Sequence, residues 1–197
     1  MKHPVRFLTP AILLVALFAL GACGPSNTVR LLQRPSDALQ SIPASTAPSI
    51  AVVLLKDVRP NQHIGVKRDN SPFIPGGSPS EWVTRSLADA FVRQGMRATY
   101  AKDIEEARAS QSQYTLTGEL HEVWIAESSK TELSASVKAF ISVSGQKGRV
   151  LNENLTSSLS KQNLLTGSAA EDLLYNTLQE LVQSVANKTQ QAIAAQR

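Results

Sequence analysis

Hydrophobic and polar residues follow two different periods along this chain, and these periods separate predicted strands from predicted helices. A continuous apolar run, Ile50–Leu55, is typical of a strand that is covered on both faces. Three later runs alternate apolar and polar residues, as strands with one buried face do. They cover residues 114–125, 133–143 and 150–159. The first of them changes phase at His121-Glu122, which predicts a β-bulge there.

Helices are predicted where a capping residue precedes an apolar stripe of period 3.6. Ser78 and Glu81 form a capping box at the start of a helix that Gly95 ends. Asp103 begins a second, short helix in the same way, and Ser168 begins a long terminal helix.

A short strand lies between the first two helices, so the predicted order of elements is β-α-β-α-β-β-β-α. This order predicts an α+β fold, with one mostly antiparallel sheet and helices packed on one face. Leu181 of the terminal helix is expected to lie against the sheet.

The N-terminus has the build of a secretory signal peptide. Lys2 and Arg6 precede an apolar run that is too short to span a bilayer. The run ends in Leu20-Gly21-Ala22-Cys23, which resembles a bacterial lipobox. The resemblance implies cleavage before Cys23, a covalent diacylglycerol on its sulfur and an N-acyl chain, so that lipid would hold the mature protein to a membrane. An ordinary signal peptide with a chance cysteine is the alternative.

The chain is predicted to divide into three parts. Residues 1–22 are the lipoprotein signal peptide, residues 23–49 are the acylated cysteine and a tether rich in Pro and Ser, and residues 50–197 are a single periplasmic α+β domain. Within the tether, Val29–Leu32 could instead dock as an edge strand. Gly24 follows the cysteine, where an Asp holds many Gram-negative lipoproteins in the inner membrane. The resemblance to sorted lipoproteins therefore implies the outer membrane.

Composition narrows the possible functions without naming one. Cys23 is the only cysteine, so the domain must fold without a disulfide. Lys2 and Arg6 leave with the signal peptide, and the remaining 18 basic and 16 acidic residues give a net charge of +2, which does not argue for nucleic acid. After cleavage only His63 and His121 remain, without partners at metal-ligand spacing, so no metal site is predicted.

The stretch from Asp57 to Gly95 resembles the YajG family of bacterial lipoproteins. The residues that carry the resemblance are Asp57-Val58-Arg59, Ile64, Val66-Lys67-Arg68-Asp69-Asn70, Leu87 and Gly95. The resemblance implies the fold and an envelope location over most of the mature chain, and it implies no chemistry.

The same stretch contains the candidate binding residues Asp57, Arg59, Arg68, Asp69 and Asn70. Asp57 and Arg59 lie two apart at a strand end, so their side chains share a face. A hairpin turn at Asp69-Asn70 would bring Arg68 and Asp69 back to them beside Phe73. We expect a salt-bridged loop clamp here, and ligand binding is the alternative.

Other candidate features are weaker. Gly76-Gly77-Ser78 could hold an anion at a helix N-terminus, but the same residues serve as a turn and a cap. Trp82 and Trp124 favour core positions, although Trp124 on the phase-shifted strand could be exposed as a sugar platform. No Gly-x-Ser-x-Gly elbow is present to activate a serine.

These features together predict a non-enzymatic outer-membrane lipoprotein that faces the periplasm and binds an envelope protein or peptidoglycan. The alternative is an accessory or regulatory subunit of an envelope machine, such as a lipid transporter or a peptidoglycan synthase. A hydrolase is the third hypothesis. No cofactor is predicted beyond the acyl chains on Cys23, and neither nucleic acid nor metal is an expected partner.

Overall fold

The computed structural model describes residues 27–31, 33, 43–162 and 167–195, so the predictions for Cys23 and Gly24 lie outside the described residues. In chain order the elements are β1 (Thr28–Val29), β2 (Ser49–Val53), β3 (Lys56–Asp57), β4 (Gly65–Val66), β5 (Ile74–Pro75), α2 (Pro79–Arg93), β6 (Arg97–Ala101), α3 (Ile104–Ala109), β7 (Tyr114–Ser129), β8 (Glu132–Gly145), β9 (Gly148–Gln162) and α4 (Ala169–Ala194).

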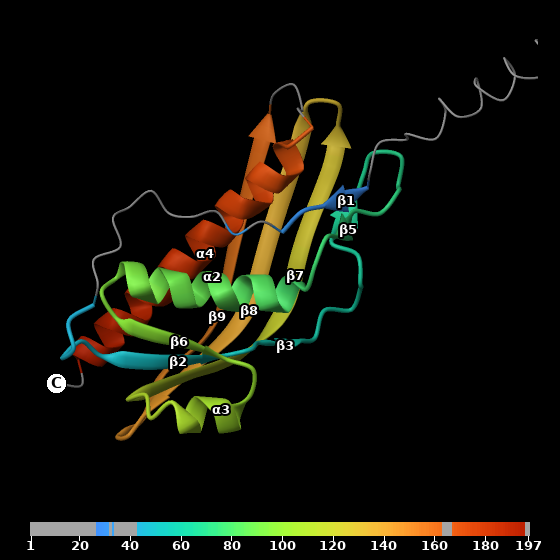
Figure 1. Cartoon of the computed structure of the whole chain (residues 1–197). Helices are drawn as coiled ribbons and strands as arrows, with labels where there is room; N and C mark the ends of the chain where they lie inside the picture. The colour runs from blue at the N-terminus through green and yellow to red at the C-terminus, as the bar shows by residue number, and fades with distance from the viewer. Residues whose placement is uncertain (1–26, 32, 34–42, 163–166, 196–197) are drawn as a thin grey trace, which may run out of the picture.

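One mixed sheet forms the centre of the molecule, with strand order β6-β2-β7-β8-β9 (Figure 1). The long strands β7, β8 and β9 are antiparallel, whereas β2 runs parallel to both of its neighbours. The short strands β3 and β4 add to β7 in parallel, and β1 pairs with β5 in a separate two-stranded sheet. The predicted α+β fold with a mostly antiparallel sheet is confirmed.

Helices α2 and α4 cover one face of this sheet, and the main core lies between them and the strands (Figure 1). Strand β2 is buried on both of its faces, as its continuous apolar run predicted. Ile50 and Val52 face the main core, whereas Ala51 and Val53 form a second, small cluster with Ala107 of α3 and one residue of β6. The short helix α3 therefore packs on the opposite face, under β2 and β6 only. The expectation that the helices share one face holds for α2 and α4 and is wrong for α3, because β2 is apolar on both sides and needs a cover on each.

The phase change in β7 corresponds to a β-bulge. The pairing of β7 with β8 shifts between Leu120 and Glu122, which leaves His121 as the extra residue. Val123 and Ile125 consequently return to the main core after the bulge. The predicted bulge is confirmed, and it turns the neighbouring side chains Glu122 and Trp124 toward the open face of the long strands, which is the face opposite α2 and α4.

Two of the three predicted helix caps are present. Ser78 Oγ accepts a hydrogen bond from the Glu81 backbone N–H at 3.3 Å, and the Asp103 carboxylate accepts one from the Glu106 N–H at 2.8 Å. Glu81 does not reach back to complete the box, because its carboxylate binds Arg85.

The predicted capping box of α4 is wrong. Ser168 makes no side-chain cap bond, and its Oγ donates instead to Asp172 at 3.0 Å. The expected box partner, Glu171, is bound by Arg30 from the N-terminal segment. A contact between residues far apart in the chain has replaced the local one.

Candidate functional site

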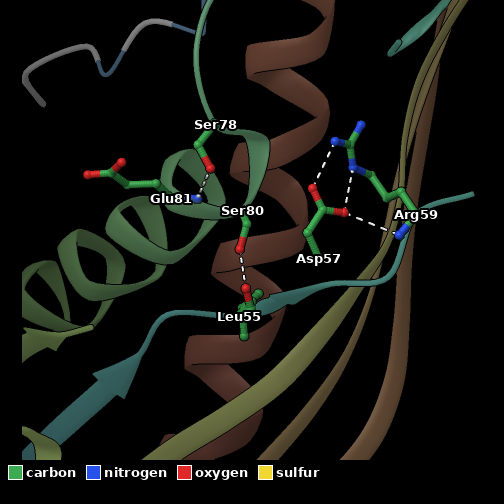
Figure 2. A network of polar contacts seen from close by, with 6 residues as sticks. All are labelled: Leu55, Asp57, Arg59, Ser78, Ser80 and Glu81. Atoms are coloured by element: carbon green, nitrogen blue, oxygen red, sulfur yellow. Dashed lines mark hydrogen bonds and ion pairs between the residues drawn. The ribbon is translucent and has the colours of Figure 1, made fainter. Parts of the chain in front are cut away.

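Asp57 and Arg59 form a bidentate ion pair at the end of β3, so the expected shared face is confirmed (Figure 2). Arg59 Nε and Nη2 each donate to a carboxylate oxygen of Asp57 at 2.9 Å, and the Arg59 backbone N–H donates to the same carboxylate at 3.2 Å. The Arg59 side chain is 7% exposed, whereas that of Asp57 is 36% exposed. The pair thus combines a buried cation with an anion that water can reach.

The first turns of α2 hold the chain between β2 and β3 beside this pair. The buried side chain of Ser80 donates to the backbone carbonyl of Leu55, as Figure 2 shows. Thr84 Oγ1, also buried, accepts from the Leu55 N–H at 3.0 Å and donates to the Ser80 carbonyl at 2.7 Å. The role of these two hydroxyl residues was not predicted from the sequence. The available signal was small polar residues beside the apolar stripe of an amphipathic helix.

Electrostatics keep the Asp57 side chain ionised. Burial raises the pKa of Asp57, but the hydrogen bonds and the charge of Arg59 lower it by more, so the pKa lies below its ordinary value. The pair uses only two of the three guanidinium nitrogens. Arg59 Nη1 is buried and has no hydrogen-bond partner among the described residues. One donor of a buried cation is therefore left over.

Arg59 also lines a pocket of about 130 Å³, at the place where β7 separates from the strands beside it. Strand β3 pairs with β7 as far as Leu120, and β4 rejoins it at Ile125. Residues 58–64 of the connecting loop face the bulge of β7 across this gap. The pocket is lined by Arg59, Pro60, Asn61, His63, His121, Glu122, Val123 and Trp124.

Gly65 fixes the end of the loop against β7. Its φ is +143°, and a Cβ at this position would lie 1.9 Å from the Ile125 carbonyl oxygen. The Ile125 N–H donates to the carbonyl of Ile64 at 2.8 Å. Only a residue without a side chain allows this close approach, which closes one end of the pocket.

The pocket brings together aromatic and polar groups that the sequence analysis treated as isolated. The rings of His63 and Trp124 lie 5.5 Å apart, tilted by 54°. His121 Nε2 lies 3.5 Å from the carboxylate of Glu119. Trp124 is half-buried and lies outside the main core, so its burial falls between the core and exposed positions considered for it, whereas Trp82 is a core residue. The predicted bulge was the signal that could have indicated this site.

The turn of Arg68, Asp69 and Asn70 lies apart from the ion pair. The Asp69 carboxylate accepts from the Ser71 N–H at 3.0 Å and from its Oγ at 2.6 Å, and Asn70 has a φ of 63°. The predicted turn is therefore formed. However, β4 reaches Ala126 of β7, six residues beyond the partner of Asp57, which is about 20 Å along a strand. The predicted hairpin forms, with Val66 bridged to Pro72, but it lies farther along β7. Arg68 and Asp69 are therefore not brought to Asp57 and Arg59.

Residues 27–31, part of the predicted tether, dock on the domain. The carbonyls of Asn27 and Val29 accept backbone hydrogen bonds of 2.9 and 2.8 Å from Ile74 and Gly76. The side chain of Val29 is buried in the main core. Arg30 donates to the Glu171 carboxylate at 3.0 and 3.2 Å. The segment therefore docks as an edge strand, which was the alternative to a free tether.

The described part of the chain offers neither a metal site nor a membrane-spanning helix. Its residues contain no group of three or more His, Cys, Asp or Glu placed to hold a metal ion. None of its helices combines the length and apolar character that crossing a membrane requires. At the start of α2, Ser78 is used as the cap, and the Glu81 carboxylate lies in the first turn.

Comparisons with known proteins show similarity at the level of the fold. No protein-family model and no curated protein sequence matches the chain. The DUF330 protein XCC0632 from Xanthomonas campestris is 15% identical with a TM-score of 0.55, over 87% of this chain and 100% of that one. The PelC dodecamer from Paraburkholderia phytofirmans is 13% identical with a TM-score of 0.47, over 75% and 92%. A minor lipoprotein from Acinetobacter baumannii is 14% identical with a TM-score of 0.38, over 76% and 94%. The likeness to XCC0632 shows a shared fold.

Proposed function

We propose that this chain is a lipid-anchored binding module of the bacterial cell envelope, without catalytic activity, held in the outer membrane by acyl chains on Cys23 and facing the periplasm. The signal peptide and the lipobox-like Leu20-Gly21-Ala22-Cys23 support the anchor, and Gly24 supports the outer membrane as the destination. The resemblance of residues 57–95 to the YajG family fits the same location.

The docking of β1 is the observation that carries this proposal. Asn27 stands four residues after Cys23, and its carbonyl already binds the domain. Four extended residues span about 14 Å at most. A lipidated Cys23 would therefore hold the domain close to the bilayer surface, with a much shorter reach than a free tether over residues 23–49 would have.

The pocket at Arg59 suits binding better than hydrolysis. Among the described residues, His63 contacts Trp124 and His121 contacts Glu119, and neither histidine is hydrogen-bonded to a serine or threonine. A hydroxyl nucleophile needs such a base beside it. The lack of an activated hydroxyl in this pocket therefore supports a binding role over hydrolysis.

An accessory subunit of an envelope machine, such as a lipid transporter or a peptidoglycan synthase, is the second candidate. The edge strand β9 favours it, because β9 has 15 residues and pairs with β8 only within the described part of the chain. An open edge offers backbone groups to a strand of a partner protein. Crosslinking in intact cells separates the two candidates, since a subunit should be recovered in one stoichiometric protein complex and a glycan-binding module should follow the sacculi.

Palmitate labelling with membrane fractionation tests the anchor. We expect the wild-type chain to be labelled and to fractionate with the outer membrane, and Cys23→Ser to remain an unlabelled, unprocessed precursor. Gly24→Asp is the matched variant: it should still be labelled but should move to the inner membrane. Normal processing of Cys23→Ser would overturn the lipid anchor, and wild-type protein in the inner-membrane fraction would overturn the destination.

A further inference from the structure

Trp124 lines a second hollow, of about 350 Å³, on the open face of the long strands. Four serines share it, and its full lining is Trp124, Ser134, Ala135, Ser136, Ser158, Leu159 and Ser160. Trp124, Ser136 and Ser158 are register partners across β7, β8 and β9, so they lie in one row on one face. Neighbouring strands lie about 4.8 Å apart, which makes this row about 10 Å long.

The serine-lined hollow and the pocket at Arg59 are neighbours on β7. Trp124 lines both of them. Glu122, from the pocket, accepts a hydrogen bond from Ser136 Oγ, in the serine-lined hollow. A ligand lying along β7, β8 and β9 would therefore contact both hollows together.

The side chains that line the two hollows carry no excess of positive charge, since Arg59 and Glu122 are the charged residues among them. Arg59 is neutralised by Asp57, and Glu122 stands opposite Lys138 of β8. The four serines and Asn61 are uncharged, and each of them both donates and accepts hydrogen bonds. Because no net positive charge is focused there, a phosphate or a carboxylate is not the favoured ligand. A neutral ligand with many hydroxyl or amide groups is favoured.

The unpartnered Nη1 of Arg59 adds a specific requirement. Arg59 is more than nine-tenths buried, and in Figure 2 the nitrogen without a dashed line points away from Asp57. A buried donor without a partner is unfavourable. Arg59 lines the pocket, so a ligand oxygen would remove this cost if a small movement of the side chain exposes Nη1 to the pocket.

We propose that the two hollows form one site for a neutral glycan, with a sugar ring against Trp124 and its hydroxyl and acetamido groups bound by Arg59, Asn61 and the serines. The C–H face of a sugar ring is apolar and flat, as the indole face is, and hydroxyl groups surround it. This inference rests on the proposed function, because it names the chemistry of the envelope partner.

The probe is the β-1,4-linked tetramer of N-acetylglucosamine, titrated by calorimetry into the lipidated full chain in detergent. We expect saturable binding with the wild-type chain. Trp124→Ala should raise the dissociation constant about tenfold, because it removes the contact between the sugar ring and the indole. Trp124→Phe should restore most of the affinity, because it returns a flat ring. Trp82→Phe is the matched control at the buried tryptophan, and its affinity should equal that of the wild type.

Four outcomes would overturn the inference. They are an absence of heat at about 10 mM sugar, equal affinity of Trp124→Ala and wild type at equal melting temperature, displacement of the sugar by inorganic phosphate, and a dimer in sedimentation that Trp124→Ala dissociates while no sugar binds. The last would assign the open face to a second copy of the chain. If the wild-type chain incorporates palmitate but does not bind the sugar, only this site is refuted. If the wild-type chain binds the sugar but incorporates no palmitate in cells, only the anchor is refuted.

Discussion

The two faces of the long strands are built from different residues. Toward α2 and α4, strand β8 presents only buried apolar side chains, which are Leu133, Ala135, Val137, Ala139, Ile141 and Val143. The intervening residues of the same strand face away from the helices, and they are Ser134, Ser136, Lys138, Phe140, Ser142 and Ser144. Alternate residues of β8 thus belong to two different surfaces. One surface packs against the helices, and the other meets solvent.

This difference indicates how the molecule separates stability from recognition. Burial of apolar area is the dominant favourable term in folding, and here it is concentrated on the helix side of the sheet. The serine-rich face contributes little to that term, so its residues can vary without loss of the fold. We therefore expect changes on the helix side to lower the free energy of unfolding, and changes on the open face to alter binding.

The largest expected effect is at Leu181, which is buried in α4 against the sheet. Leu181→Ala should lower the free energy of unfolding by about 2 to 5 kcal/mol, because it leaves a cavity in the core. Urea denaturation measures this change. Exposed Gln190 on the same helix is the matched control, and Gln190→Ala should stay within about 0.5 kcal/mol. An unchanged midpoint for Leu181→Ala would place this stripe outside the core.

A smaller effect, and an asymmetric one, is expected at the ion pair. Asp57→Ala leaves the buried Arg59 charge unpaired, which should cost about 3 kcal/mol. Arg59→Ala leaves a carboxylate that water can reach, and should cost only about 1 kcal/mol. Thermal or urea unfolding of the two variants decides the order. The reverse order would mean that Asp57 is the partner that depends on the pair.

Arg59→Ala also separates a clamp from a binding site. If the pair only holds the loop, sugar affinity per folded molecule should stay unchanged in this variant. If Arg59 serves the proposed site, the affinity should fall while most of the protein remains folded. We expect the second result, although the sequence alone favoured the clamp.

A pH dependence is expected at acid pH only. The hydrogen bonds from Arg30 hold the pKa of Glu171 below its ordinary value, and the pKa of Asp57 is also lowered. Both carboxylates bind protons more weakly when the chain is folded, so their contribution is present above about pH 4 and is lost as the pH falls below it. Melting temperatures measured from pH 7 to pH 3 should fall mainly at the acid end. The double variant Asp57→Asn, Glu171→Gln should show a shallower fall, and an equally steep one would assign it to other carboxylates.

The smallest expected effect on stability is on the open face. Ser158→Ala should change the free energy of unfolding by less than about 0.5 kcal/mol, because Ser158 is exposed and only its hydroxyl is lost. The same change should weaken sugar binding roughly threefold, as the loss of one neutral hydrogen bond does. A large drop in stability would show that the two faces are not independent.

The helices and strands with a clear hydrophobic period were predictable from the sequence. Contacts between segments far apart in the chain were not. The alternating pattern of β8 indicates one buried face, and the continuous apolar run of β2 indicates two. Both strands were therefore predictable from the sequence. The bond between Arg30 and Glu171 links opposite ends of the chain, and nothing in the local pattern of Ser168 indicates that its capping partner is taken.

The candidate site was predicted in part for the same reason. Asp57 and Arg59 are two residues apart, so their contact followed from the period of a strand. The meeting of His63 with Trp124 depends on where β4 rejoins β7, and local periodicity does not specify that register.

The most direct measurement is a map of the binding surface by two-dimensional NMR of the isotope-labelled, lipidated full chain in detergent, titrated with the same N-acetylglucosamine tetramer. We expect chemical-shift changes at the Trp124 indole and at the amides of Ser136 and Ser158, with Leu181 and the turn at Asn70 unchanged. Changes concentrated at that turn or in the helix-side core, or no changes at saturating sugar, would contradict the assignment of recognition to the open face.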